Sequence, residues 1–422
     1  MSRNVFFELI EVTDASNSIK LFDNENTKIL DLIDTVEIDG QKESDVSEYY
    51  TFDSEGLHTV LIILKSSLET MSGLFSDCYY LQEVDISGLD TSKVTSMAGL
   101  FRRCTSLTTI DFGRINTSNV TTMEEMFLGC GNLVSFDLSF FDTSKVKDMN
   151  NMFSACSSLV KLELNTFNTS QVTNMSSMFC SCLNLKEVDL TKFNTKKVTN
   201  MNSMFYGCKK LENLDLSNFD TSNVEDMHGL FAHCKNLSFL YVTNFNTEKV
   251  KYMQYMFDSC CSLVYLDLSS FTTESVEDMK FMFFGCSLLS NLDLSNFNVE
   301  KVKDFRNMFH ACTSLVMLDL SSFGNNSSSE ISFMFSGCSS LIQVDLANFC
   351  SDKLSNIAHM FDGCEKLTSI DMRNFDMSQV ENYEGIFEEI PKEGSFIGNT
   401  SFSEELLKLV PGSWEKVVVK KT

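Results

Sequence analysis

Proline, tryptophan and histidine are scarce in this chain of 422 residues, which contains two, one and five of them. Both prolines, Pro391 and Pro411, lie near the C-terminus, so the first 390 residues contain none. Proline has no backbone N–H to donate and is excluded from the interior of paired strands. Its scarcity therefore fits a chain whose N–H groups mostly donate to a neighbouring strand or turn.

Basic residues and long apolar runs are also in short supply. The 33 Lys and Arg are outnumbered by 58 Asp and Glu, which leaves a formal charge of −25. Such a charge repels nucleic acids and anionic membranes, so we expect no nucleic-acid partner. No stretch is long enough to predict membrane insertion, and Glu8 and Glu11 interrupt the apolar run that a signal peptide would need. These features, together with free thiols, favour a cytoplasmic location.

A phenylalanine recurs every 26 residues from Phe75 to Phe387, without insertion or deletion. Twelve of these phenylalanines are followed three residues later by a cysteine, from Cys78 to Cys364, and a leucine stands three residues further on. Self-similarity at a fixed period is the sequence signature of a repeat array, in which each unit buries its apolar residues against its neighbours. We expect a solenoid with continuous columns of Phe, Cys and Leu.

Within one repeat, residues 205–230, the spacing predicts a strand and then a helix or turn. In LENLDL, Leu214 and Leu216 alternate with outward-facing residues, as in a short parallel strand. The apolar residues that follow stand at i, i+3, i+4 and i+7, which is the spacing of one helical face. They are Met227, Leu230, Phe231 and Cys234. The predicted fold class is an α/β solenoid with one short parallel strand and a short helix or turn per repeat.

The pattern C-x-x-L-x-x-L-D-L-S-x-F-[DN]-T-S-x-V-x-x-M-x-x-M-F resembles the BspA-like leucine-rich repeat family in its 26-residue form. Residues 156–179, CSSLVKLELNTFNTSQVTNMSSMF, carry the resemblance almost position by position. It implies a leucine-rich-repeat fold and a role in surface display, adhesion or protein binding, with no catalytic residues to carry over. The resemblance thus favours a location at the cell surface, whereas the composition favours the cytoplasm.

The two ends of the chain do not repeat and are expected to cap the array. We predict a β-rich N-terminal cap over residues 1–70, the repeat array of about 12–13 units over 71–390, and a C-terminal cap over 391–422. In the last segment, GSFIGNTSF, SEELLKLV and SWEKVVVKK suggest a strand, a short helix and a strand, with Trp414 covering the end of the array.

Cysteine and histidine are the residue types in this chain that most often take part in metal binding or catalysis. Twelve of the fifteen cysteines share one phase of the repeat and are expected to be buried and reduced. Cys180, Cys261 and Cys350 fall out of phase and are the candidates for reactive thiols. The five histidines share no phase, and neither a zinc pattern nor a phosphate-binding glycine motif occurs. We expect no cofactor, no metal and no catalytic residues.

The outward position between the two inward leucines of each strand is acidic in eleven of twelve repeats. Stacked carboxylates repel, so this column must be solvated, neutralised by a basic partner, or bound to calcium. The exception is Tyr241, and the neighbouring outward column carries Phe239 and Tyr265. Aromatic residues clustered on a polar surface are typical of binding hot spots. The candidate partner-binding residues are Phe239, Tyr241, Tyr265, Asp189, Asp215, Asp267 and Asp293.

Three functions follow from these features. The first is a non-catalytic protein that mediates protein–protein interaction or adhesion through its acidic strand face, with a partner that is basic in one interpretation. The second is a structural spacer or coat component that assembles end to end. The third is an enzyme with a site in the caps, for example around His58. The sequence does not predict the oligomeric state.

Overall fold

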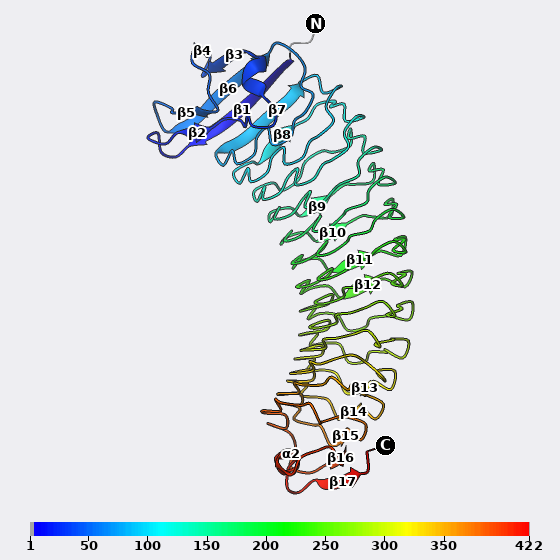
Figure 1. The fold of residues 1–422 in the computed structure, drawn as a ribbon. Helices are drawn as coiled ribbons and strands as arrows, with labels where there is room; N and C mark the ends of the chain where they lie inside the picture. The colour runs from blue at the N-terminus through cyan, green and yellow to red at the C-terminus, as the bar shows by residue number, and fades with distance from the viewer. Residues whose placement is uncertain (1–3, 422) are drawn as a thin grey trace. The chain divides into compact units, whose positions relative to one another are not determined.

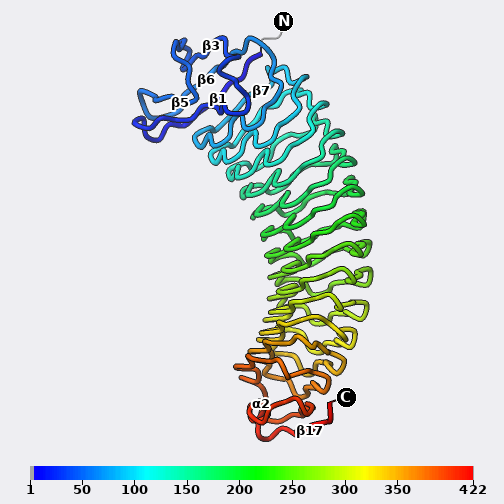
Figure 2. Tube along the Cα trace, in the orientation of Figure 1, coloured from blue at the N-terminus to red at the C-terminus, as the bar shows by residue number. Residues whose placement is uncertain are grey.

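The computed structural model describes residues 4–421, and the chain divides into two compact units. One unit comprises Met1–Val198 and Gly207–Leu211, and the other comprises Thr199–Tyr206 and Glu212–Thr422. Within each unit the trace winds in successive coils that stack on one another (Figure 2). The predicted repeat solenoid is therefore present, and it is a β-solenoid with almost no helix.

The N-terminal sheet of the first unit has the strand order β4-β3-β6-β1-β7-β8 (Figure 1). Its strands are β1 (Asn4–Val12), β3 (Ile33–Ile38), β4 (Gln41–Glu43), β6 (Gly56–Leu64), β7 (Leu81–Gly88) and β8 (Thr109–Asp111). β1 pairs antiparallel with both β6 and β7, and β7 pairs parallel with β8. Because β7 and β8 are the strands of the first two repeats, the N-terminal segment continues the sheet of the array.

The remaining elements of the first unit are short. They are β2 (Ile19–Lys20), α1 (Ile29–Leu32), β5 (Tyr49–Tyr50), β9 (Lys161–Leu162) and β10 (Glu187–Val188). β2 and β5 form a separate antiparallel pair, and β9 and β10 pair in parallel at the same position of successive repeats.

The second unit contains the later repeat strands and the C-terminal segment. Its elements are β11 (Asn213–Asp215), β12 (Phe239–Tyr241), β13 (Met317–Asp319), β14 (Gln343–Asp345), β15 (Ser369–Asp371), β16 (Ser395–Asn399), α2 (Glu404–Leu409) and β17 (Glu415–Val419). The C-terminal order of strand, helix and strand is as predicted. Trp414 is 4% exposed, and its indole N–H donates to the carbonyl of Pro391 at 2.8 Å. Among residues 4–421, neither helix is long and apolar enough to cross a membrane.

Two columns of side chains form the interior of the coils. Within each unit, the phenylalanines of successive repeats stack with ring centroids 5.3–6.1 Å apart, beginning with Phe75 and Phe101. Beside them, each in-phase cysteine thiol from Cys104 onward donates to the carbonyl of the phenylalanine 29 residues earlier, as Cys104 does to Phe75 at 3.0 Å. All twelve in-phase cysteines are buried and all fifteen are free, so the predicted cysteine column is confirmed.

The helical alternative for Met227–Cys234 is wrong, because the segment is a series of tight turns. The N–H groups alternate between two kinds of acceptor: Leu230 donates to Met227 at 3.2 Å within the coil, whereas Phe231 donates to Met256 of the next coil at 2.9 Å. Gly229 and His233 have positive φ angles of 58° and 60°, which a right-handed helix cannot contain. The apolar spacing places all four predicted residues in the interior, but it does not distinguish a helix from these turns.

The left-handed residues recur at the same two positions of every repeat, two residues before and two after the column phenylalanine. Glycine fills the site after the phenylalanine at Gly129, Gly207, Gly285, Gly337 and Gly363, and non-glycine residues such as Ala155 and Ser181 fill it elsewhere. A left-handed backbone costs an L-residue free energy that glycine avoids. The hydrogen bonds to the next coil hold the other residues in that conformation.

A column of buried threonines also joins successive coils. The hydroxyl of Thr143 donates to the carbonyl of Asn168 at 3.1 Å and accepts from the N–H of the same residue at 2.8 Å. Equivalent pairs of bonds are made by Thr91, Thr117, Thr169, Thr221, Thr247 and Thr273. The threonine of the [DN]-T-S motif therefore satisfies two backbone groups of its neighbour.

Candidate functional site

Asp and Asn side chains shape up to three corners of a coil. In the repeat that begins at Phe127, the Oδ1 atoms of Asp137, Asp142 and Asp148 each accept a hydrogen bond from the backbone N–H two residues later, at 2.8, 3.0 and 2.9 Å. This bond defines an Asx turn, in which the side chain replaces a backbone acceptor. The acidic residues therefore recur at fixed positions because they form the turns of the coil.

The predicted acidic column belongs to one of these corners. Asp189 lies in the first unit, and Asp215, Asp267 and Asp293 lie in the second. The N–H groups of Thr191, Ser217, Ser269 and Ser295 donate to them at 2.9–3.0 Å. Hydrogen bonds from the hydroxyl and the N–H two residues later lower the pKa of Asp189, Asp215 and Asp267, and those from the N–H and hydroxyl of Ser295 lower the pKa of Asp293.

Neighbouring acids in the column still repel one another. The charge of Asp293 raises the pKa of both Asp267 and Asp319, in opposition to the turn hydrogen bonds that lower it. The carboxylates whose pKa the turn lowers, Asp215, Asp267, Asp293 and Asp319, therefore form a negative surface on the strand side of the second unit.

Three exposed aromatic side chains interrupt this negative surface, and we call them the aromatic cluster: Phe239, Tyr241 and Tyr265. Their exposed fractions are 59%, 53% and 71%. Phe239 and Tyr241 are the outward residues of β12, and the register of β11 and β12 places Asn213 beside Phe239 and Asp215 beside Tyr241. Tyr265 stands one repeat after Phe239. Within residues 4–421, none of these rings stacks on another ring, so all three faces are open.

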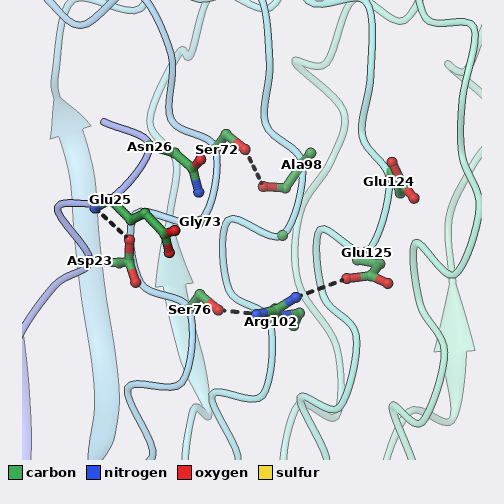
Figure 3. A pocket seen from close by; sticks show the side chains of 11 residues that line it. Asp23, Glu25, Asn26, Ser72, Gly73, Ser76, Ala98, Arg102, Glu124 and Glu125 are labelled. Atoms are coloured by element: carbon green, nitrogen blue, oxygen red, sulfur yellow. Dashed lines mark hydrogen bonds and ion pairs between the residues drawn. The ribbon is translucent and has the colours of Figure 1, made fainter. Parts of the chain in front are cut away.

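A polar pocket of about 220 Å³ lies in the first unit, between the loop after β2 and the turns of the first repeats. Asp23, Glu25, Glu124 and Glu125 contribute carboxylates to its lining. Figure 3 shows Arg102 across the pocket, where its guanidinium donates to the Ser76 hydroxyl at 3.1 Å and to Glu125 at 3.4 Å. Among the described residues that line this pocket there is no histidine and no cysteine, and the apolar walls of a typical small-molecule site are missing.

His58, the centre of the enzyme hypothesis, has a structural environment. Its Nδ1 lies 2.7 Å from Asp39 and its Nε2 lies 2.9 Å from the carbonyl of Ser54. The side chain is 8% exposed and its ring packs at 4.5 Å from that of Phe52. Both ring nitrogens are thus occupied by neighbours, and neither is directed at a substrate-sized cavity. A general base needs a free nitrogen within reach of the proton that it removes.

The burial of each thiol follows its position in the repeat, as predicted. Cys180, Cys261 and Cys350 are half-buried, whereas the twelve column thiols are buried. Burial raises the pKa of ten column thiols, to about 12 for Cys156 and Cys338. Because the thiolate is the reactive form, the column is chemically inert at neutral pH.

Comparison with known proteins gives a matching family model and several similar solved structures. A family model described as "Mycoplasma protein of unknown function, DUF285" matches residues 64–158, 132–240, 226–344 and 289–399. No curated protein matches the chain in sequence. A solved structure described as "Functional domain of InlJ from Listeria monocytogenes includes a cysteine ladder" matches at 16% identity and a TM-score of 0.23, and the match covers 84% of this chain and 74% of that one.

Proposed function

The chain belongs to the repeat family described as Mycoplasma protein of unknown function, DUF285, and we propose that it is a non-catalytic scaffold that binds a protein partner through the aromatic cluster. The observation that carries the proposal is the exposure of Phe239, Tyr241 and Tyr265, each of which is more than half exposed on the strand surface that carries the acidic column. Tyrosine and other aromatic side chains are enriched at interfaces, where they contribute large contact area at low entropic cost.

The partner has apolar side chains that cover the three rings and basic side chains around them. Asp215 lies beside Tyr241 in the strand register, and Asp267 is the acidic residue of the repeat that contains Tyr265. A lysine or arginine of the partner meets a carboxylate on either side of the cluster, and the net charge of −25 steers such a partner to the surface. An extended or loop segment with alternating apolar and basic residues fits this arrangement.

The test is capture from extracts followed by identification of the retained protein. The purified chain is immobilised beside a variant in which Phe239, Tyr241 and Tyr265 are replaced by serine. Because these side chains are exposed and make no ring contacts within residues 4–421, their replacement leaves the interior columns intact. The expected result is a protein that the wild type retains and the variant loses.

A matched control removes three aromatic residues of similar exposure from the first unit: Tyr49→Ser, Tyr79→Ser and Phe140→Ser, which are 50%, 46% and 51% exposed. This control is expected to retain the partner. Equal retention by all three proteins would contradict the proposal. A wild-type chain that retains nothing but forms a concentration-dependent ladder in gel filtration would favour the end-to-end spacer instead.

The proposal extends to location through the resemblance of the repeat to BspA-like surface proteins. A binding role in adhesion requires that the aromatic cluster is accessible from outside the cell. Protease treatment of intact cells that produce the chain tests this directly. Cleavage of the chain in intact cells is expected for a displayed adhesin, whereas complete protection would place the interaction inside the cell.

A further inference from the structure

A second group of side chains lies on the turn side of the second unit, away from the strands: His359, Asp362 and Glu388. One ligand atom from each lies within 4.8 Å of the other two. The Nδ1 atom of His359 and the Oδ2 atom of Asp362 are 3.3 Å apart. Glu388 follows Asp362 by 26 residues, so the two carboxylates occupy the same position of successive coils. Within residues 4–421, no other trio of such side chains meets this spacing.

The backbone beneath the trio is held by two hydrogen bonds between the coils. The N–H of His359 donates to the carbonyl of Glu384 at 2.8 Å, and the N–H of Gly363 donates to the carbonyl of Glu388 at 3.1 Å. The three side chains therefore rise from adjacent coils whose separation is fixed. A site on a fixed backbone does not need to order a loop when it binds an ion.

The imidazole of His359 is held by its neighbours at the same repeat position. One coil earlier, Phe333 stacks on the imidazole with centroids 4.7 Å apart and planes inclined by 11°. One coil later, the position is Gly385, where an added Cβ would lie 2.3 Å from Nδ1 of His359. Only a residue without a side chain leaves room for the ring to lie over this coil, with Nδ1 directed at the carboxylates.

We propose that His359, Asp362 and Glu388 bind a divalent transition-metal ion, for which Zn²⁺ is the best match. One imidazole nitrogen and two carboxylate oxygens form a mixed donor set that suits zinc, whereas calcium and magnesium prefer oxygen donors alone. Three protein ligands leave the fourth tetrahedral position to water.

The geometry needs only a small adjustment. With bonds of about 2.0–2.1 Å, the donors of a tetrahedral zinc site lie about 3.3 Å apart, close to the separation of His359 and Asp362. Glu388 is exposed, so its side chain is free to rotate toward the ion. A bound cation also neutralises two carboxylates that otherwise repel each other on adjacent coils.

The experiment is a calorimetric titration of the full chain with Zn²⁺ under reducing conditions. We expect one ion per chain, with Ca²⁺ and Mg²⁺ unable to displace it at equal concentration. His359→Gln and Glu388→Gln are expected to weaken binding at least about tenfold, because even the loss of a residue that only supports a ligand costs about 10–100-fold in metal affinity. Glu388 is exposed, so its substitution tests the site without affecting the fold.

The control is His228→Gln. His228 lies 2.8 Å from Asp226 in another histidine–aspartate pair, but residues 4–421 supply no third ligand there. Its substitution is expected to leave zinc affinity unchanged. The proposal is overturned if the wild type binds no stoichiometric zinc, or if His359→Gln and Glu388→Gln bind zinc as tightly as His228→Gln does. Zinc held by the half-buried thiols would produce the second of these results.

Discussion

Glu8 is the side chain whose replacement should change stability most clearly. It lies in the middle of β1, on the face that also buries Phe6 and Ile10, and it is 0% exposed. Neither carboxyl oxygen has a hydrogen-bond partner among residues 4–421. Burial raises the pKa of Glu8 well above its usual value. The N-terminal sheet therefore contains an unsatisfied buried acid, which opposes folding at neutral pH.

Glu8→Met replaces the carboxyl with an apolar group of similar length. A buried polar group without a partner costs about 1–3 kcal/mol, so the variant is expected to be more stable by about that amount at pH 7. Glu8→Gln keeps an unsatisfied polar group at the same place and is expected to gain less. Hydrogen exchange of peptides that cover β1 and β6 measures the effect locally, because both strands belong to the same sheet.

The sign of the pH dependence follows from the raised pKa. Between the unfolded and the folded pKa, the folded chain holds a proton on Glu8 that the unfolded chain releases, so stability falls as the pH rises from about 4.5 toward the folded pKa. The maximal slope for one proton is about 1.4 kcal/mol per pH unit. Glu8→Met should remove this slope. Lower protection of β1 in Glu8→Met, or an unchanged pH dependence, would refute the reasoning.

Three further predictions concern the repeats. Thr143→Val deprives two backbone groups of Asn168 of their partner and is expected to lower the free energy of unfolding in urea by about 1–3 kcal/mol. Thr143→Ser keeps both hydrogen bonds and should lower it by only about 0.8 kcal/mol, for the lost methyl. Ala155→Gly should stabilise the chain by about 1 kcal/mol in the same assay, since the residue has a φ of 59°, and an unchanged midpoint would contradict the left-handed turn. With a thiol reagent, three cysteines are expected to react in the folded chain and twelve only after unfolding; rapid reaction of more than three would contradict the buried column. The three are Cys180, Cys261 and Cys350.

The repeat period and the interior columns were predictable because each depends on residue identity at one phase. Phe75 and Cys78 belong to series that continue through the array, and stacking such series buries them. The conformation of the segment around Phe231 was not predictable from its apolar spacing. The spacing i, i+3, i+4 and i+7 identifies the buried residues, but it is the same for a helix and for the tight turns found here. The signal for turns was the recurrence of glycine two residues after the column phenylalanine, as at Gly129 and Gly207.

The candidate sites differ in what the sequence reveals. The aromatic cluster was identifiable because Tyr241 breaks an acidic column, and its side chains are exposed as expected of a surface site. The acidic column itself was harder to interpret, since the turn-forming role of Asp215 becomes visible only with the N–H of Ser217 in place. The trio around His359 could not be found from the repeat period. His359 stands at a different position of the repeat from Asp362 and Glu388, so the 26-residue spacing does not connect it with them.

The most direct test of the account is the affinity of the captured partner for the wild type, the triple-serine variant at 239, 241 and 265, and the triple-serine control at 49, 79 and 140. A hot-spot residue contributes about 2 kcal/mol or more, and a loss of 2 kcal/mol corresponds to about a 30-fold increase in Kd. The proposed role of the aromatic cluster predicts at least this increase for the aromatic-cluster variant and less than a twofold change for the control. Equal Kd values for the wild type and the aromatic-cluster variant would contradict it.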